Sequence, residues 1–113
     1  MFTEIELNQF NGTENYYQYW LGFKYTDGVK YLADIGKCYW LLDIIGSYQP
    51  KMKKYSIQIW ELKVNDDKKA IVTMREDTDS PIKVKQKLDY TDFPVKEIKL
   101  FLINGVLILP SEY

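Results

Sequence analysis

The side chains of this chain that could take part in chemistry are carboxylates, tyrosines and one cysteine, because the sequence contains no histidine. Without histidine there is no side chain that ordinarily titrates near neutral pH, and no Ser–His or Cys–His pair. Histidine is also the commonest zinc ligand, and a single cysteine cannot replace it. The six glycines are scattered, so the chain has no glycine-rich phosphate loop. We therefore expect no metal and no cofactor.

The tripeptide Tyr-Thr-Asp occurs twice, each time just before a predicted chain reversal. Local turn chemistry explains the repeat if the Thr and Asp side chains accept hydrogen bonds from free backbone amides. Alternatively, the two segments lie together and present their side chains to a partner, since tyrosine is a favoured interface residue. The candidate binding residues are then Tyr25, Asp27, Tyr90 and Asp92.

Three carboxylates lie near apolar segments, where removal from water could raise a pKa and suit a carboxyl group to catalysis. They are Asp27, Asp43 and Asp92. Asp43 lies on the narrow polar face of an apolar segment, and exposure to solvent is the simpler expectation for it. Cys38 lies on the apolar stripe of the same segment, which predicts a buried, inert thiol with a raised pKa.

The segment 38–49 is the element around which the rest of the fold is expected to be organised. At 100° per residue its apolar side chains occupy more than half of the helix circumference, so they must be covered on more than one side. A shorter helix is predicted before it, capped by the first Tyr-Thr-Asp and ended by Gly36 in the left-handed conformation. Pro50 is expected to end the long helix. The two predicted helices span about 27–35 and 37–49.

After the helices the pattern changes to extended structure. The phase of the alternation slips near Ile59–Trp60, which predicts either a β-bulge or burial of both faces. Asn104-Gly105 predicts a hairpin, because a type I′ turn needs positive φ at both positions. The aromatic segment 14–25 also favours extended structure and is expected to cover the second side of the helix. The strands form an antiparallel meander of about five, at 55–64, 69–75, 82–90, 95–103 and 106–109.

These elements predict one α+β domain over residues 1–113, with the helices packed on one face of the sheet. The net charge is −1 and Arg75 is the only arginine, which argues against nucleic-acid binding. Lys83, Lys85 and Lys87 are expected to form a solvated row on one strand. The longest apolar run is too short to span a bilayer, so no membrane association is expected. One cysteine and an acidic N-terminus predict a cytoplasmic protein.

Four segments resemble a family of small bacterial proteins of unknown function, often encoded near plasmid or phage genes. They are YTDGVKYLA at 25–33, YWLLD at 39–43, YTDFP at 90–94 and LPSEY at 109–113. The resemblance extends over nearly the whole chain and implies a single domain. It implies no activity and no catalytic or binding residue.

The sequence favours a non-catalytic protein-interaction module, such as an inhibitor or accessory factor of a mobile element. Its partner is expected to be another protein or a second copy of the chain, which would pair through the strand 106–109 if this strand lies at a sheet edge. One alternative is a small-ligand-binding domain with a pocket between the helix 38–49 and the sheet, lined by Trp40 and Trp60. The other alternative is a carboxylate-dependent enzyme.

Overall fold

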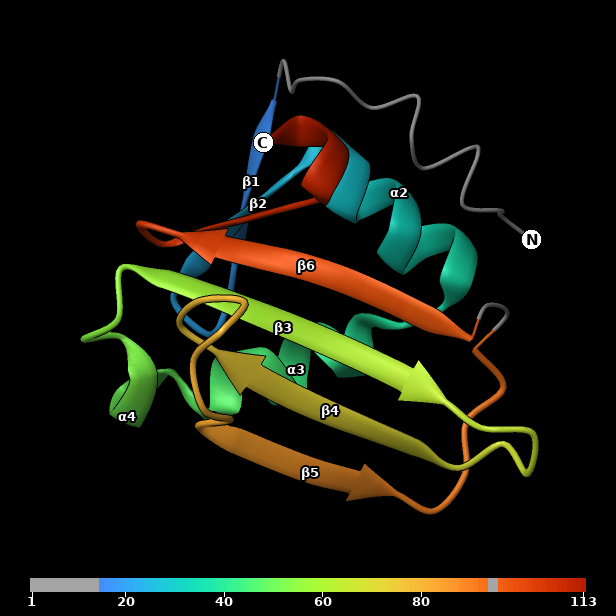
Figure 1. Cartoon of the computed structure of the whole chain (residues 1–113). Helices are drawn as coiled ribbons and strands as arrows, with labels where there is room; N and C mark the ends of the chain where they lie inside the picture. The colour runs from blue at the N-terminus through green and yellow to red at the C-terminus, as the bar shows by residue number, and fades with distance from the viewer. Residues whose placement is uncertain (1–14, 94–95) are drawn as a thin grey trace.

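The computed structural model describes residues 15–93 and 96–113. Strands β1 (Tyr16–Tyr19) and β2 (Phe23–Thr26) precede helices α2 (Asp27–Gly36), α3 (Tyr39–Ser47) and α4 (Gln49–Met52). The later elements are β3 (Ile57–Val64), β4 (Ala70–Arg75), β5 (Val84–Leu88), β6 (Glu97–Ile103), β7 (Val106–Ile108) and the 3-10 helix η1 (Pro110–Glu112). These strands form one sheet in the order β1-β2-β7-β6-β3-β4-β5, and α3 lies behind it in Figure 1.

The mixed α/β architecture and the predicted strands are confirmed, but the five-stranded antiparallel meander is wrong as a topology. The aromatic segment 14–25 adds the strands β1 and β2, and β2 runs parallel to β7. After β5, at one edge of the sheet, the chain returns to the interior as β6, beside β3. The predicted and observed strand orders differ because parallel pairing and crossovers join residues far apart in the sequence, and no local sequence pattern predicts such contacts.

The two predicted helices are present with different ends. Gly36 remains helical, and the left-handed residue is Lys37, with φ 50°. The predicted helix 37–49 is divided, because α3 ends at Ser47 and a new turn begins. Pro50 does not end α3. It lies in the first turn of α4, where a helix needs no N–H donor.

Helix α3 lies at the centre of the hydrophobic core, as its sequence predicts. Leu41, Leu42 and Ile45 are at most 2 % exposed, and Cys38 is completely buried. Burial raises the pKa of the Cys38 thiol to about 12, so this side chain is an inert part of the core. The sheet contributes to the same cluster through Trp60, Leu62, Val72, Met74, Leu100 and Leu102, and the first hairpin contributes Tyr19, Phe23 and Tyr25.

Strand β3 is buried on both faces, which accounts for its slipped alternation. Ile59 is 7 % exposed and its neighbour Trp60 is 1 % exposed, although they point to opposite sides of the sheet. The pairing with β4 and with β6 continues without interruption through both residues. Of the two predicted explanations, two-sided burial is therefore confirmed and the β-bulge is wrong.

The hairpin of β6 and β7 has the predicted turn, but β7 does not meet the condition for pairing with a second copy, which was an edge position in the sheet. Asn104 and Gly105 have φ values of 49° and 81°, both positive as a type I′ turn requires. Strand β7 lies between β2 and β6, however, so both of its backbone edges are already paired. The strand predicted at 106–109 is therefore not an edge, and it cannot join a second copy by strand pairing.

Gly46 lets α3 pack closely against the turn between β1 and β2. A Cβ at this position would lie 2.6 Å from Leu21 Cβ, which is closer than packed carbon atoms approach. We expect Gly46→Ala to lower the free energy of unfolding by about 1–3 kcal/mol in urea titrations, because overpacking outweighs the higher helix propensity of alanine. Ser47→Ala, at the exposed neighbouring position, is the control. A Gly46→Ala variant of wild-type stability would show that Leu21 can move aside.

Candidate functional site

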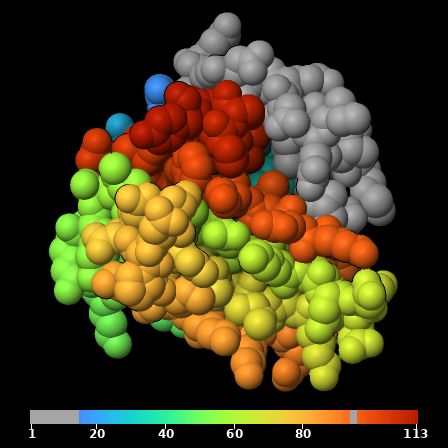
Figure 2. Space-filling view, in the orientation of Figure 1, coloured from blue at the N-terminus to red at the C-terminus, as the bar shows by residue number. Residues whose placement is uncertain are grey.

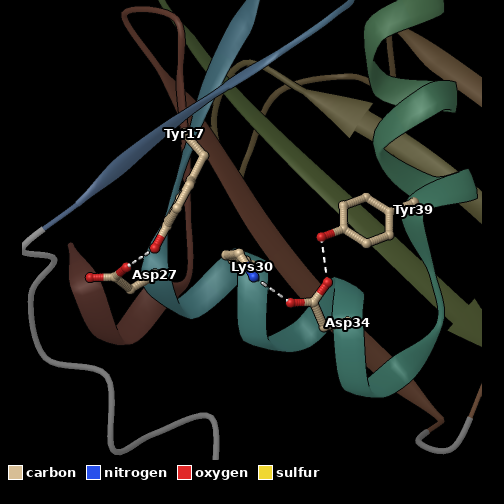
Figure 3. Close-up of polar contacts among 5 residues, drawn as sticks. All are labelled: Tyr17, Asp27, Lys30, Asp34 and Tyr39. Atoms are coloured by element: carbon tan, nitrogen blue, oxygen red, sulfur yellow. Dashed lines mark hydrogen bonds and ion pairs between the residues drawn. The ribbon is translucent and has the colours of Figure 1, made fainter.

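Three tyrosine hydroxyls donate hydrogen bonds to aspartates along one side of the molecule. Tyr17 Oη lies 2.8 Å from Asp27 Oδ1, and Tyr19 Oη lies 2.5 Å from Asp43 Oδ1. The third bond joins Tyr39 Oη to an aspartate on α2 over 2.5 Å. We call these pairs the tyrosine–aspartate belt, which comprises Tyr17–Asp27, Tyr19–Asp43 and Tyr39–Asp34; Figure 3 shows the first and the last of them.

Two further contacts make the belt continuous from β1 across α2 to α3. Lys30 Nζ lies 2.7 Å from Asp34 Oδ2 and 5.7 Å from the centroid of the Tyr17 ring (Figure 3). The rings of Tyr19 and Tyr39 stack with 6° between their planes and 6.4 Å between their centroids. The belt therefore ties the first strand to both long helices.

The raised pKa values of the belt tyrosines favour a structural role for these side chains over a catalytic one. The hydrogen bond to Asp27 raises the pKa of Tyr17. Burial, followed by the bond to Asp43, raises the pKa of Tyr19 to about 12, and burial also raises the pKa of Tyr39. Tyrosines that hold their protons this firmly donate hydrogen bonds, and they are poor general bases and nucleophiles near neutral pH.

The structure does not bring the four sequence-predicted binding residues together. Tyr25 is 9 % exposed in the core, and Asp27 begins α2, where it accepts the Tyr17 bond. Tyr90 and Asp92 follow β5, which is the edge strand at the other end of the sheet. Tyr90 is 67 % exposed, and it lines an open groove of about 370 Å³ with Trp40, Ile44, Leu88 and Asp92.

The threonines of the two Tyr-Thr-Asp segments perform the local turn chemistry that one interpretation predicted. Thr26 Oγ1 accepts a hydrogen bond from the Val29 amide at 3.3 Å and so caps α2. Thr91 Oγ1 accepts from the Phe93 amide at 3.2 Å. The repeat is thus explained by two separate turns, and it does not define a joint surface.

The space between α3 and the sheet, where a ligand pocket was predicted, is filled by side chains. Trp60 is 1 % exposed there, and its Nε1 donates to Gln58 Oε1 at 2.9 Å. Trp60 is therefore closed to a ligand, and the predicted region is open only at its margins. One groove, of about 370 Å³, lies between Trp40 and Ile44 on α3 and Leu88 on β5. A second groove, of about 420 Å³, lies at the end of the segment 38–49, between Gln49, Phe23 and Tyr55, with Gln58 at its wall.

The three candidate catalytic acids lie on different elements. Asp27 begins α2, Asp43 lies on α3 and is exposed, and Asp92 follows β5. Within residues 15–93 and 96–113 there is no cluster of three or more His, Cys, Asp or Glu side chains that could hold a metal ion. In the same part of the chain, no helix has the length and apolarity to cross a membrane.

The outer face of the sheet, opposite α3, carries an apolar surface that spans three strands. Residues paired across β3, β6 and β7 form two rows on this face. In the view of Figure 2 the sheet lies in front of α3, so this is the side that faces the reader. We call this surface the outer apolar face; its rows are Ile57–Ile103–Val106 and Ile59–Phe101–Ile108.

Two exposed tyrosines border the outer apolar face. Tyr16 on β1 is 59 % exposed, and Tyr113 is 76 % exposed. The Tyr113 ring meets Phe101 edge to face, with 5.5 Å between ring centroids. Sequence reasoning missed this surface, although β3, β6 and β7 carry apolar residues at both alternation phases. That pattern signals a strand with two apolar faces.

Glu112 joins the end of this face to the start of α2. Its Oε1 accepts hydrogen bonds from Thr26 Oγ1 at 2.7 Å and from the Leu109 amide at 2.9 Å. Gly28 allows this approach, since a Cβ there would lie 2.7 Å from the same oxygen. The other carboxylate oxygen, Oε2, is buried and has no hydrogen-bond partner among residues 15–93 and 96–113.

The fold and these surfaces define a mixed α/β domain whose sheet is covered by helices on one face and apolar over part of the other. The chain belongs to a family of unknown function, DUF6876, whose model matches residues 1–113. No curated protein and no solved structure matches the chain.

The belt predicts a specific dependence of stability on acid. Hydrogen bonds from Lys30 and then Tyr39 lower the pKa of Asp34 below its ordinary value of 3.8. A carboxyl group whose pKa is lower in the folded protein than in the unfolded protein stabilises the fold at every pH above its unfolded-state pKa. This stabilisation is lost as the pH falls through the folded-state pKa. We expect Asp34→Asn to reduce the loss of unfolding free energy below about pH 4. The Asp34 side chain is 40 % exposed, so the change should stay below about 1 kcal/mol.

Urea unfolding between about pH 2 and pH 7 measures this effect. Asp67→Asn, in the exposed turn between β3 and β4, is the matched control, because it removes a carboxylate that lies outside the belt. If Asp34→Asn and Asp67→Asn lose stability in acid as steeply as the wild type does, the assignment to Asp34 is incorrect.

Proposed function

We propose that this chain is a non-catalytic protein-interaction module that binds a partner protein through its outer apolar face. The observation that carries the proposal is the double row of apolar side chains across β3, β6 and β7. Among them Ile57 is 44 % exposed, and Phe101, Ile103, Val106 and Ile108 remain partly exposed, whereas Ile59 is only 7 % exposed. The accessible part of the face is therefore made by β6, β7 and the start of β3. Apolar patches that are continuous across several strands mark protein-binding surfaces when no helix covers them.

The rest of the same face supports a protein partner, because it has the character of an interface rim. Next to the apolar rows, Glu61 pairs with Lys99 and Lys63 pairs with Glu97 across β3 and β6. Alternation places all four side chains on the outer side of the sheet. An apolar centre beside a polar, charged margin is the usual anatomy of a protein interface.

The sheet edge is less suited to this role. Strand β5 is an edge strand, and Lys85 and Lys87 on it are exposed. Exposed lysines on an edge strand disfavour pairing with a strand of another chain, because the partner strand would have to accommodate their charges. The β5 edge of the sheet is therefore a poor place for a partner strand to pair.

The biological setting is part of the same proposal. The single cysteine, buried and free, suits a reducing compartment such as the cytoplasm. The likeness to small bacterial proteins encoded near plasmid or phage genes supports a role as an inhibitor or accessory factor of a mobile element. Small inhibitors of this kind act by covering a surface of their target, for which a preformed apolar face is well suited.

A small-ligand-binding domain is the second candidate function. The observation that favours it is the groove of about 420 Å³ lined by Phe23, Gln49, Tyr55 and Gln58, with Lys53 at the same site. Its combination of aromatic walls and a few polar groups is typical of ligand sites. The amides of Gln49 and Gln58 already bond to each other at 2.9 and 3.0 Å, however, so a ligand must compete with them.

Site-specific photo-crosslinking in the native host tests the protein-binding proposal. A benzophenone amino acid placed at Ile57, on the outer apolar face, should give a discrete adduct with a partner. The same probe at Ser47, exposed on α3, should not. Adding Ile103→Thr, which keeps a β-branched residue but makes the row polar, should abolish the adduct. Equal adducts from Ile57 and Ser47, or no adduct from Ile57, would contradict the proposal.

A further inference from the structure

We propose that the groove beside Glu112 receives a lysine side chain of the partner protein. The groove has a volume of about 450 Å³ and lies at the β7 end of the outer apolar face. This inference rests on the proposed function, and it names the chemistry by which the partner would be recognised. The residues that carry it are Tyr16, Ile103, Val106, Ile108, Glu112 and Tyr113.

The first argument is the unfilled hydrogen-bonding capacity of the Glu112 carboxylate. Its Oε2 atom is buried and has no hydrogen-bond partner in the described part of the chain, which is costly for a polar atom and more so for a charged one. Glu112 takes part in none of the four ion pairs found among the described residues. The N-terminus of α2 lies close by and offers partial positive charge, yet it supplies no donor to this oxygen. A donor from outside would complete the site.

The second argument is that the walls of the groove fit an apolar stem with a cationic end. Ile103, Val106 and Ile108 form an aliphatic wall along which methylene groups can lie. Tyr16 and Tyr113 add two aromatic rings to the same groove, and ring faces attract cations. Tyr113 is 76 % exposed and lines the same groove. Because Oε2 is buried in the free chain, the ammonium group of the partner must displace part of the groove wall to reach it.

The third argument selects lysine over arginine. Glu112 Oε1 already accepts two hydrogen bonds, from Thr26 and Leu109, and a carboxylate oxygen has two lone pairs. Only Oε2 is available, so the parallel two-bond contact that favours a guanidinium group cannot form. A single charged acceptor suits the ammonium group of lysine, which acts as a point charge.

Nuclear magnetic resonance titration of the full chain with short peptides tests the proposal. The probes are acetyl-Ala-Lys-Ala-amide and the peptides in which norleucine or arginine replaces the lysine. The lysine peptide should shift the amide signals of residues 106–108 and 112–113, with a dissociation constant on the order of 1 mM. The norleucine peptide should bind about tenfold more weakly, because it lacks the charge-assisted bond. The arginine peptide should bind no more tightly than the lysine peptide.

Two variants of the groove separate recognition of the charge from folding. Glu112→Gln keeps an oxygen for Thr26 and Leu109 but replaces Oε2, and it should weaken lysine binding about tenfold. Tyr16→Leu leaves the Glu112 contacts intact and should weaken lysine binding about threefold without affecting the norleucine peptide. Glu61→Gln is the matched control on the charged part of the same face, and it should bind lysine as the wild type does.

The outcomes distinguish this inference from the proposed function. Equal binding of the lysine and norleucine peptides, or lysine binding that survives both groove variants, overturns the lysine site. If the lysine site is overturned but the probe at Ile57 still gives an adduct, the proposal of a protein-interaction module is retained and only the assignment of the groove to lysine is rejected. An arginine peptide that binds about tenfold more tightly overturns the argument from the single free oxygen.

Discussion

The burial of α3 is the constraint on which the rest of the structure depends. This helix is apolar around more than half of its circumference, and Leu41, Leu42 and Ile45 are almost completely removed from water. The strands β3, β4 and β6 cover only one side of such a helix, so a second cover is required from another part of the sheet. The hairpin of β1 and β2 supplies it, with Tyr19 reaching α3 through its bond to Asp43. The tyrosine–aspartate belt therefore lies at the polar border of the core in which β1 and β2 pack against α3.

Features specified within a few residues could be predicted from the sequence. The approximate helix positions, the five later strands and the turn at Asn104-Gly105 follow from periodicity and from the φ values that these residues tolerate. Features that join distant segments could not. The parallel pairing of β2 with β7 and the passage from β5 to β6 depend on which strands meet in space. The division of the long helix was missed for a different reason: Pro50 is compatible with the first turn of α4 as well as with a helix end.

The candidate site was less predictable than the fold. Repetition of Tyr-Thr-Asp suggested one surface, but Thr26 and Thr91 serve separate turns, because capping depends only on neighbouring amides. The outer apolar face has a sequence signal in strands that are apolar at both phases, yet recognising it requires knowing that α3 packs on the opposite side of the sheet. The role of Glu112 had no signal at all, since its bond to Thr26 joins residues 86 positions apart.

The contact between Thr26 and Glu112, together with the parallel pairing of β2 and β7, has a consequence for synthesis on the ribosome. Strand β2 is able to pair with β7 only after residues 106–108 have been made. Until then the early hairpin and α2 lack both their lateral support and the carboxylate at the helix start. Strands β3, β4, β5 and β6 pair with one another and need no later segment, so this part of the sheet is able to form earlier. The first hairpin joins the sheet only through β7, which makes its docking a late step of folding.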